Sequence, residues 1–423
     1  MGVQLYPYQA AQLDASRGFN RVAYYHDMGL GKTFTGAEKA VSYGLPILLV
    51  CQKSKIGDWI NHFRQYYSLT PFNLTLKRQY EEFFGTVGLF VGVINYDLIF
   101  RREELRSLKN FTLVLDESSC IQNETAKRSK FILKMQPQNV VLLSGTPTAG
   151  KYEKLWSQLH LLGWGISKKL YYQQYVEMEW IEDQGSGFRI PHVTGYKNVD
   201  RLKAKLAAHG AFFLKTEDVL TLPKQVFIPI ETAPASCYSR FMKDSYMEID
   251  GREYIGDTLL AKRTYARMMC GHLNPDRVAA FRDLVDSTED RLIVFYNFTD
   301  ELQAMIHALM NVERPISIIN GKEKDLTAYE ESADSITFVQ YQAGAMGLNL
   351  QKANKIIYFS LTDRSELYEQ SKKRIHRIGQ ETTCFYYQLL CPGTIEEDIL
   401  ATLQMRKDYT DELFKAYHEK QHG

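Results

Sequence analysis

Short apolar runs alternate with amphipathic segments along the first third of the chain. Five runs have the length of a buried strand: Val22–His26, Ile47–Cys51, Phe90–Asn95, Thr112–Asp116 and Val140–Ser144. Between them, apolar residues recur at helical spacing over residues 33–43, 55–67, 97–107 and 125–135. Strands that alternate with helices predict a parallel sheet covered by helices on both faces. In that architecture ligands bind at the carboxyl ends of the strands.

The same alternation of predicted strands and helices occurs in the final third of the chain. Strands are predicted at Leu292–Tyr296, Ile316–Ile319, Ile336–Tyr341, Lys355–Phe359 and Phe385–Leu390, with helices between them. The two regions share no visible sequence identity, so we infer a repeated architecture rather than a sequence repeat. Residues 151–215 are aromatic and charged, and residues 234–286 are rich in Arg, Lys and Met; both predict helical insertions. We therefore predict an α/β protein of two lobes, residues 1–222 and 223–423, each with a parallel sheet and a helical insertion.

Composition narrows the class of protein. A chain of 423 residues fits two or three domains, and 45% hydrophobic and 24% charged residues are ordinary for a globular protein. The formal net charge of +1 gives no general case for nucleic acid, so any such site must come from local clusters. The six cysteines form no Cys-x-x-Cys pair, which predicts neither a zinc site nor a disulfide framework. Without a signal sequence or a membrane-spanning run, we expect a reduced cytoplasmic protein with no membrane partner.

A glycine-rich stretch follows the first predicted strand. Residues 28–33 read Met-Gly-Leu-Gly-Lys-Thr and precede a predicted helix, so Gly29 and Gly31 allow backbone N–H groups to face phosphate at the helix N-terminus. In that geometry Lys32 reaches the β- and γ-phosphates and the Thr33 hydroxyl holds Mg²⁺. The first glycine of the usual eight-residue pattern is missing, because His26 stands there. Taken alone, the stretch also fits a Gly-rich turn with a surface lysine.

Two other strand ends carry chemically useful side chains. The strand ending at Asp116 is followed by Glu117, and alternation along a strand lets Asp116 face Mg²⁺ while Glu117 faces the attacking water. The alternative is a strand end followed by a polar turn. Ser144-Gly-Thr-Pro147 follows the next strand and places hydroxyls at the same edge of the sheet.

A basic segment in the second lobe supplies the last candidate residues for phosphate chemistry. Gln370, Arg374 and Arg377 are spaced by four and three residues, which predicts one face of a helix. Arginines on such a face can stabilise charge on a transferring phosphoryl group. Lys372 and Lys373 lie in the same segment, so a solvated basic face is the alternative.

Taken in order, these motifs resemble the SWI/SNF-related helicase-like ATPases of superfamily two. The resemblance rests on Tyr8-Gln9, residues 28–33, Asp116-Glu117, residues 144–147, Gly344-Ala-Met-Gly-Leu-Asn-Leu350 and Arg374-Ile-His-Arg-Ile-Gly-Gln380. It extends from Leu5 to about Asp398, and the last motif is especially characteristic of that family. The resemblance implies two RecA-like lobes with ATP between them and double-stranded DNA across them.

Carried over position by position, the resemblance implies a set of site residues. ATP would be bound by Gln9, which reads adenine, and by Met28, Gly29, Leu30, Gly31, Lys32, Thr33 and Gly347; Mg²⁺ would be bound by Thr33 and Asp116. Hydrolysis would depend on Lys32, Asp116, Glu117, Gln370, Arg374 and Arg377. DNA contacts, mainly to phosphates, would come from Lys53, Ser54, Asn95, Tyr96, Thr146, Gln340 and Gln342. Weaker DNA candidates in the insertions are Lys203, Lys205, Lys262, Arg263 and Arg267.

The chain also departs from that family. His26 replaces an acidic residue before the loop, Ser119 stands in place of a histidine in the Asp-Glu-x-His box, and residues 363–365 read Asp-Arg-Ser where Trp-Asn-Pro is common. Leu214-Lys-Thr216 replaces an Arg-rich linker. These departures bear on the coupling between hydrolysis and movement more than on hydrolysis itself.

The function predicted from this resemblance is an ATP-dependent translocase on double-stranded DNA that remodels protein–DNA complexes or branched DNA. The chain's compactness favours a bacterial or phage-encoded enzyme. Three alternatives stay open: a strand-separating DNA or RNA helicase, a DNA-binding clamp with a decayed ATPase, and a motor that depends on a protein partner for targeting. A monomer is sufficient for one ATP site, because the arginines lie in the same chain as the phosphate loop.

Overall fold

The computed structural model of the chain describes residues 3–182, 189–344 and 348–418. The chain divides into two compact units. Lobe 1 comprises residues 1–181, 190–221 and 408–423, and lobe 2 comprises residues 182–189 and 222–407. The predicted second domain, 223–423, differs from this division at its end, because residues 408–423 group with lobe 1.

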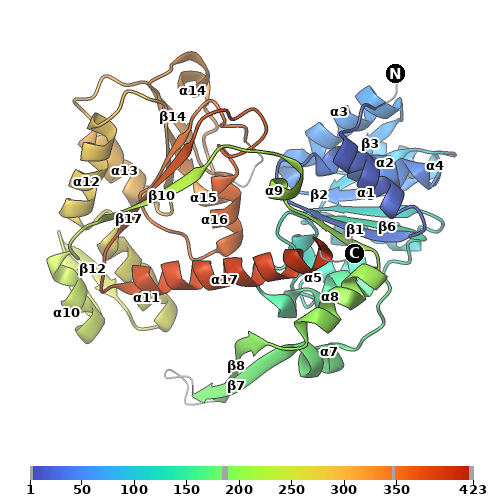
Figure 1. Cartoon of the computed structure of the whole chain (residues 1–423), viewed down its shortest axis with the longest axis horizontal. Coiled ribbons are helices and arrows are strands. Elements are labelled where there is room, and N and C mark those ends of the chain that lie inside the picture. The colour runs from blue at the N-terminus through green and yellow to red at the C-terminus, as the bar shows by residue number, and fades with distance from the viewer. Residues whose placement is uncertain (1–2, 183–188, 345–347, 419–423) are drawn as a thin grey trace. The chain divides into compact units, whose positions relative to one another are not determined.

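Lobe 1 is built on a seven-stranded sheet in the order β3-β4-β2-β5-β6-β1-β9, with every strand pair parallel (Figure 1). Its strands are β1 (Arg21–His26), β2 (Ile47–Cys51), β3 (Pro71–Asn73), β4 (Val91–Asn95), β5 (Thr112–Asp116), β6 (Asn139–Leu143) and β9 (Ala211–Leu214). Its helices are α1 (Pro7–Ala15), α2 (Lys32–Ser42), α3 (Ile56–Tyr67), α4 (Lys77–Gly85), α5 (Lys127–Leu133), α6 (Trp156–Leu161), α7 (Lys168–Tyr175), α8 (Val199–Ala208) and α9 (Thr216–Val219).

The strands of lobe 1 are buried on both faces, which is why they read as continuous apolar runs. Along β2, Leu48 enters one hydrophobic core while Leu49 enters the other, as the two-residue alternation of a strand requires. Aromatic packing joins Tyr409 of the last helix to this lobe. The Tyr152 hydroxyl donates to the Tyr409 carbonyl oxygen at 2.6 Å, and the rings of Tyr196 and Tyr409 meet edge to face.

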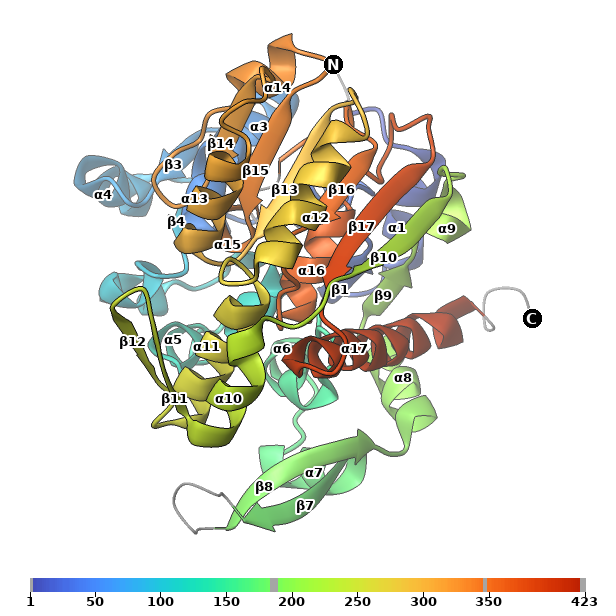
Figure 2. The same cartoon turned by 90° about the vertical axis from the view of Figure 1, so that its left-hand side faces the viewer.

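Lobe 2 repeats the plan with a six-stranded parallel sheet in the order β10-β17-β16-β13-β15-β14. Its strands are β10 (Gln225–Glu231), β13 (Leu292–Tyr296), β14 (Ile316–Ile319), β15 (Ile336–Gln340), β16 (Lys355–Tyr358) and β17 (Cys384–Leu390). Its helices are α10 (Ser236–Asp244), α11 (Leu259–Cys270), α12 (Pro275–Asp286), α13 (Thr299–Ala308), α14 (Thr327–Glu331), α15 (Tyr341–Gly344) and α16 (Ser365–Lys372); α17 (Ile395–His418) begins in this lobe. Helices α12 and α13 cover one face of the sheet (Figure 2). The predicted pair of parallel sheets flanked by helices is confirmed.

The insertions contain strands that the sequence pattern did not predict. In lobe 1 an exposed hairpin, β7 (Val176–Glu182) and β8 (Arg189–Tyr196), follows α7. In lobe 2, β11 (Tyr246–Ile249) and β12 (Arg252–Ile255) pair antiparallel around a turn in which Asp250 and Gly251 both have positive φ. Asp-Gly is the strongest short hairpin signal, so this hairpin was readable in the sequence. The first strand of the β7–β8 hairpin was readable too, because Val176-Glu-Met-Glu-Trp180 alternates apolar and charged residues.

Among the described residues, none of the helices combines the length and the apolar character that crossing a membrane requires.

Candidate ATP site and nucleic-acid interface

The phosphate loop of lobe 1 connects β1 to the N-terminus of α2. Gly29 and Gly31 have φ of +88° and +67°, a left-handed conformation that glycine adopts without steric cost. Lys32 is the first residue of α2, and its Nζ donates to the carbonyl oxygens of His26 at 2.9 Å and Asp27 at 3.2 Å. The loop therefore has the backbone shape of an anion cradle, with its lysine folded over it.

Gln9 is attached to this loop from α1. Its Nε2 donates to the carbonyl oxygens of Leu30 at 3.1 Å and Gly31 at 3.2 Å, and its Oε1 accepts from the Tyr6 N–H. A Cβ atom at Gly31 would lie 2.4 Å from Gln9 Nε2, so a side chain there would displace the Gln9 amide from the loop. The amide of Gln9 supports the phosphate loop, and its role in reading adenine stays a prediction.

Asp116 ends β5 and is held by an indole from α3. Trp59 Nε1 donates to Asp116 Oδ2 at 2.8 Å. Burial raises the pKa of Asp116 above its ordinary value, while the Trp59 hydrogen bond and the Lys32 charge oppose that rise. An Asp carboxylate and the Thr33 hydroxyl at the start of α2 are hard oxygen donors, which is the ligand type that Mg²⁺ prefers. These residues therefore fit the predicted metal.

Glu117 adopts a strained backbone conformation that a tyrosine supports. Its φ of 53° and ψ of 61° are left-handed, which is uncommon for a residue with a Cβ atom. The Tyr96 hydroxyl donates to the carbonyl oxygens of Asp116 at 2.8 Å and Glu117 at 3.3 Å. Tyr96 is 3% exposed, so its side chain faces into the lobe. Its predicted DNA contact would therefore be made by its backbone atoms.

The other predicted DNA contacts of lobe 1 lie at the same edge of the sheet. Lys53 and Ser54 are exposed in the short 3₁₀ turn after β2, Asn95 ends β4, and Thr146 follows β6. Because all strands of this sheet are parallel, these residues share the carboxyl edge with the phosphate loop and Asp116. Asn95 and Thr146 are largely buried, at 7% and 5% exposed. DNA binding by these four residues stays a prediction.

In lobe 2 the predicted DNA contacts also follow a strand. Gln340 is the last residue of β15 and its Nε2 donates to the Asn297 carbonyl oxygen at 3.2 Å, whereas Gln342 is exposed in α15. The predicted nucleotide contact Gly347 lies outside the described residues.

The predicted helix face carrying Gln370, Arg374 and Arg377 is wrong for the two arginines. Helix α16 ends at Lys372, and the arginines lie in the turns that follow. The helix ends there because residues 371–380 turn back on the segment before β16: Leu350 N–H donates to the Arg374 carbonyl oxygen.

Both arginine side chains nevertheless reach one short stretch of chain. Arg374 Nη1 donates to the Leu348 carbonyl oxygen at 3.4 Å, and Arg377 Nη1 hydrogen-bonds to Asn349 Oδ1. Burial lowers the pKa of the Arg377 guanidinium. In the described part of the chain the Oε1 of the buried Gln370 accepts no hydrogen bond. Lobe 2 thus brings the two arginines to one stretch by loop contacts, whereas Gln370 lies within α16.

Comparison with known proteins agrees with the order of these elements. The sequence matches the SNF2-related domain over residues 23–221 and the helicase conserved C-terminal domain over residues 276–379. The chain belongs to the SNF2-related family. Similar proteins include the putative ATP-dependent helicase/translocase YwqA of Bacillus subtilis, 23% identical over 92% of this chain and 46% of the relative. Another is the mouse DNA annealing helicase and endonuclease ZRANB3, 24% identical over 96% of this chain and 40% of the relative.

The chain spans less than half the length of these two curated relatives. A solved structure, the Sulfolobus solfataricus SWI2/SNF2 ATPase core in complex with dsDNA, is 17% identical to it with a TM-score of 0.47. That similarity covers 99% of this chain and 94% of the solved chain.

Several positions where this SNF2-related chain departs from the family pattern are buried. His26 is fully buried beside Tyr24, and burial, with the charge of Lys32, lowers its pKa to about 3. The ring is therefore neutral and takes no part in the loop's cradle, to which His26 contributes only its carbonyl oxygen. Ser119 is 7% exposed in the 3₁₀ turn Ser118–Ile121.

Among the weaker DNA candidates, Arg267 and Lys203 are engaged inside the protein. Arg267 Nη2 donates to the Leu361 carbonyl oxygen at 3.1 Å and Nη1 lies 3.8 Å from the Asp363 carboxylate. Lys203 lies 3.7 and 3.8 Å from the carboxylates of Asp200 and Glu412. Their side chains are 15% and 12% exposed, which leaves little surface for DNA.

One supporting residue was missed by sequence reasoning. Gln158 in α6 is fully buried; its Oε1 accepts from the hydroxyls of Ser118 at 2.7 Å and Tyr25 at 3.0 Å, and its Nε2 donates to the Pro147 carbonyl oxygen at 2.8 Å. It thereby joins β1, the turn after the paired carboxylates and the segment 144–147. The only signal in the sequence is a glutamine between Leu155 and Leu159 on a short amphipathic helix, which is not specific.

Proposed function

We propose that this chain is an ATP-dependent motor that moves along double-stranded DNA and remodels protein–DNA complexes or branched DNA. The observation that carries the proposal is the carboxyl edge of the lobe 1 sheet, where the phosphate loop, the paired carboxylates and the predicted DNA contacts meet. Membership of the SNF2-related family supports ATP as the substrate, and one similar protein is named as an ATP-dependent helicase/translocase.

The proposed division of labour follows the geometry of the edge. ATP phosphates would lie on the loop at Gly29–Lys32, Thr33 and Asp116 would hold Mg²⁺, and Glu117 would orient the attacking water and accept its proton. The metal, when bound, would supply positive charge opposite the phosphates. Gln370, Arg374 and Arg377 sense the γ-phosphate, and Gln9, Met28, Leu30 and Gly347 complete the nucleotide contacts.

Coupling to DNA is proposed to pass through Tyr96. Its neighbour Asn95 ends β4 at the predicted DNA edge, while its hydroxyl holds the main chain at Asp116 and Glu117. A shift of the β4 end on DNA binding therefore changes the support of the strained Glu117 turn. This link runs through the lobe itself and does not need the histidine that Ser119 replaces.

Steady-state ATP hydrolysis tests the proposal. We would compare the purified chain without nucleic acid, with single-stranded DNA, with double-stranded DNA and with RNA, each alongside Lys32→Ala. Stimulation chiefly by double-stranded DNA, lost in the variant, is expected. Stimulation chiefly by single strands or RNA would favour the strand-separating helicase, and a fork-unwinding assay would then decide.

Glu117→Gln separates binding from hydrolysis. The amide keeps the shape of the side chain but cannot accept a proton, so turnover should fall by about a hundredfold or more while ATP binding persists. Arg377→Ala should likewise impair hydrolysis far more than nucleotide binding. DNA and ATP binding with wild-type-like turnover in Glu117→Gln would remove Glu117 from this role, and no hydrolysis by the wild type would favour the decayed clamp or a required protein partner. Because one chain carries both the loop and the arginines, we propose that a monomer suffices for one ATP site.

A further inference from the structure

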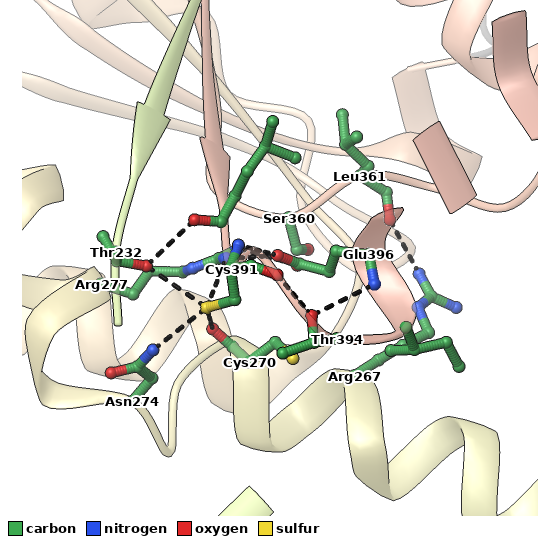
Figure 3. Close-up of polar contacts among 12 residues, drawn as sticks. Thr232, Arg267, Cys270, Asn274, Arg277, Ser360, Leu361, Cys391, Thr394 and Glu396 are labelled. Carbon is green, nitrogen blue, oxygen red and sulfur yellow. Dashed lines mark hydrogen bonds and ion pairs between the residues drawn. The ribbon is translucent and has the colours of Figure 1, made fainter. Parts of the chain in front are cut away.

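A buried polar cluster lies in lobe 2 where several elements end, and none of its members belongs to the predicted ATP site (Figure 3). Its centre is the thiol of Cys391, the residue directly after β17. Cys391 Sγ lies 3.2 Å from Arg277 Nη2, 3.3 Å from Asn274 Nδ2 and 3.3 Å from Thr232 Oγ1. The sulfur also lies 3.9 Å from the carbonyl oxygens of Ala233 and Cys270. The guanidinium and the amide are closer and can only donate to the sulfur, so they favour a thiolate over a thiol.

A second thiol lies beside the first. Cys270 is the last residue of α11, and its Sγ, the Cys391 Sγ and a carboxylate oxygen of Glu396 all lie within 4.8 Å of one another. The hydrogen bond between the two thiols lowers the pKa of Cys391, Arg277 and Thr232 lower it further, and burial and the Glu396 carboxylate oppose them. The same hydrogen bond and burial raise the pKa of Cys270. The pair is therefore unequal, with Cys391 the more acidic thiol and Cys270 the donor to it.

The arrangement does not suit a metal ion, although two thiols and a carboxylate are close together. Arg277 already donates from both Nη atoms to the two carboxylate oxygens of Glu396, and Glu396 Oε2 also accepts the Cys391 N–H at 2.8 Å. A cation held by the same three groups would lie against the guanidinium, where like charges repel. The reactive groups left are the two sulfurs.

We propose that Cys391 and Cys270 form an oxidation site at which a peroxide links α11 to the end of β17 through a disulfide. In the first step the Cys391 thiolate attacks one peroxide oxygen, the O–O bond breaks, and a sulfenic acid and hydroxide form. In the second step the Cys270 sulfur attacks the Cys391 sulfur, the S–O bond breaks, and the hydroxyl leaves as water with the Cys270 proton. Two thiols and one hydrogen peroxide thus give one disulfide and two waters.

The disulfide would change what the cluster holds together. A disulfide sulfur carries no charge, so Arg277 and Asn274 lose a charge-assisted acceptor in a fully buried site. The new bond joins α11 to the junction of β17 and α17, and α11 also carries Arg267, which is bonded to Leu361 and Asp363. Oxidation is therefore expected to alter lobe 2 and not the carboxyl edge of the lobe 1 sheet.

Cys384 provides a matched control inside the same lobe. It is as fully buried as Cys391 and lies in the same strand region, but burial raises the pKa of its thiol to about 11. The reactivity of Cys391 is thus expected to follow from its donors and its partner thiol rather than from burial, which both cysteines share.

The test is peroxide treatment of the full chain, followed by blocking of free thiols, intact mass and peptide mapping. We expect a loss of two hydrogen atoms, a Cys270–Cys391 cross-linked peptide, reversal by dithiothreitol, and no change at Cys384. Cys384→Ser should keep the cross-link, and Cys270→Ser and Cys391→Ser should abolish it. In Cys270→Ser the sulfenic acid should instead be trapped by dimedone at Cys391.

Two results would overturn the proposal. One is a wild-type chain in which Cys270 and Cys391 stay reduced while other thiols oxidise. The other is alkylation of Cys391 at neutral pH that is no faster than alkylation of Cys384 by the same reagent, because the more acidic thiol at Cys391 would then be absent. Both are read from wild-type protein, so they hold even where a serine variant fails to fold.

Discussion

Replacing Trp59 by phenylalanine tests whether the indole positions the candidate magnesium ligand. The indole Nε1 is 2.8 Å from Asp116 Oδ2, and the ring is 2% exposed and stacks on Phe63 at 5.7 Å between centroids. Phenylalanine keeps an aromatic ring in the stack but removes the donor. The buried carboxylate then loses a partner that favours its charged form.

The size of the effect follows from the hydrogen bond and from burial. A hydrogen bond to a charged group contributes about 1.5–3 kcal/mol, and about 1.4 kcal/mol corresponds to one pKa unit or a tenfold rate. The pKa of Asp116 is already above its ordinary value, and losing the donor raises it further. Protons then compete with Mg²⁺ at higher pH, so turnover at limiting Mg²⁺ should fall by about tenfold to a hundredfold.

The assay is DNA-stimulated ATP hydrolysis by Trp59→Phe as a function of pH at low and saturating Mg²⁺. The acidic limb of the pH profile should move to higher pH, and saturating Mg²⁺ should restore most of the lost activity. Phe63→Leu is the matched control, because it disturbs the same ring stack without touching the hydrogen bond. An acidic limb that does not move in Trp59→Phe, with stability lowered as in the control, would refute the positioning role and leave Trp59 as packing only.

Three further variants test the support of the same edge. Tyr96→Phe removes the hydroxyl that holds the Glu117 turn and should lower kcat about fivefold, equivalent to about 1 kcal/mol, with the KM for ATP little changed; an altered KM alone would contradict this. Gln158→Leu leaves two buried hydroxyls and one carbonyl oxygen without their hydrogen-bond partner, so it should lower the free energy of unfolding in urea by about 2–3 kcal/mol. Equal stability of the variant would show that water replaces the amide. Between about pH 7.5 and pH 5, the wild type should lose about 2 kcal/mol more stability than His26→Leu. The reason is that the histidine of the unfolded chain takes up a proton below about pH 6.5, whereas the buried ring does not until about pH 3. Parallel curves of stability against pH for the two proteins would refute a neutral buried His26.

The sequence was sufficient to predict the inner strands of both sheets and the edge, but it missed β3, β9 and β10. Strands buried on both faces read as apolar runs, and the polar residues at their carboxyl ends mark where a ligand binds, so Lys32, Asp116 and Thr146 were predicted on one edge. The prediction failed where one spacing fits both a helix and a loop. Gln370, Arg374 and Arg377 have helical spacing, but only the first lies in a helix, because the chain after Lys372 is held by contacts with residues 348–350.

The side chains that hold the site were not readable for a different reason. Trp59 and Asp116 are 57 residues apart in the sequence, Gln158 and Ser118 are 40 apart, and Gln158 and Tyr25 are 133 apart. No local period relates such pairs, and each becomes a contact only after the sheet is assembled. A motif therefore predicts where the chemistry occurs and leaves unstated which distant residues fix its geometry.

That difference gives the supporting residues a distinct experimental signature. Loss of a residue that touches the reacting atoms should reduce turnover at every pH and Mg²⁺ concentration, as expected for Glu117→Gln. Loss of Trp59 acts through the carboxylate it bonds to, so its effect should depend on protons and Mg²⁺ and should be largely rescued by the metal. Tyr96 supports the main chain rather than a carboxylate oxygen, so excess Mg²⁺ should not rescue Tyr96→Phe. The pattern of rescue thus separates residues that do the chemistry, residues that orient a ligand and residues that hold the backbone, although all of them lie at one edge of one sheet.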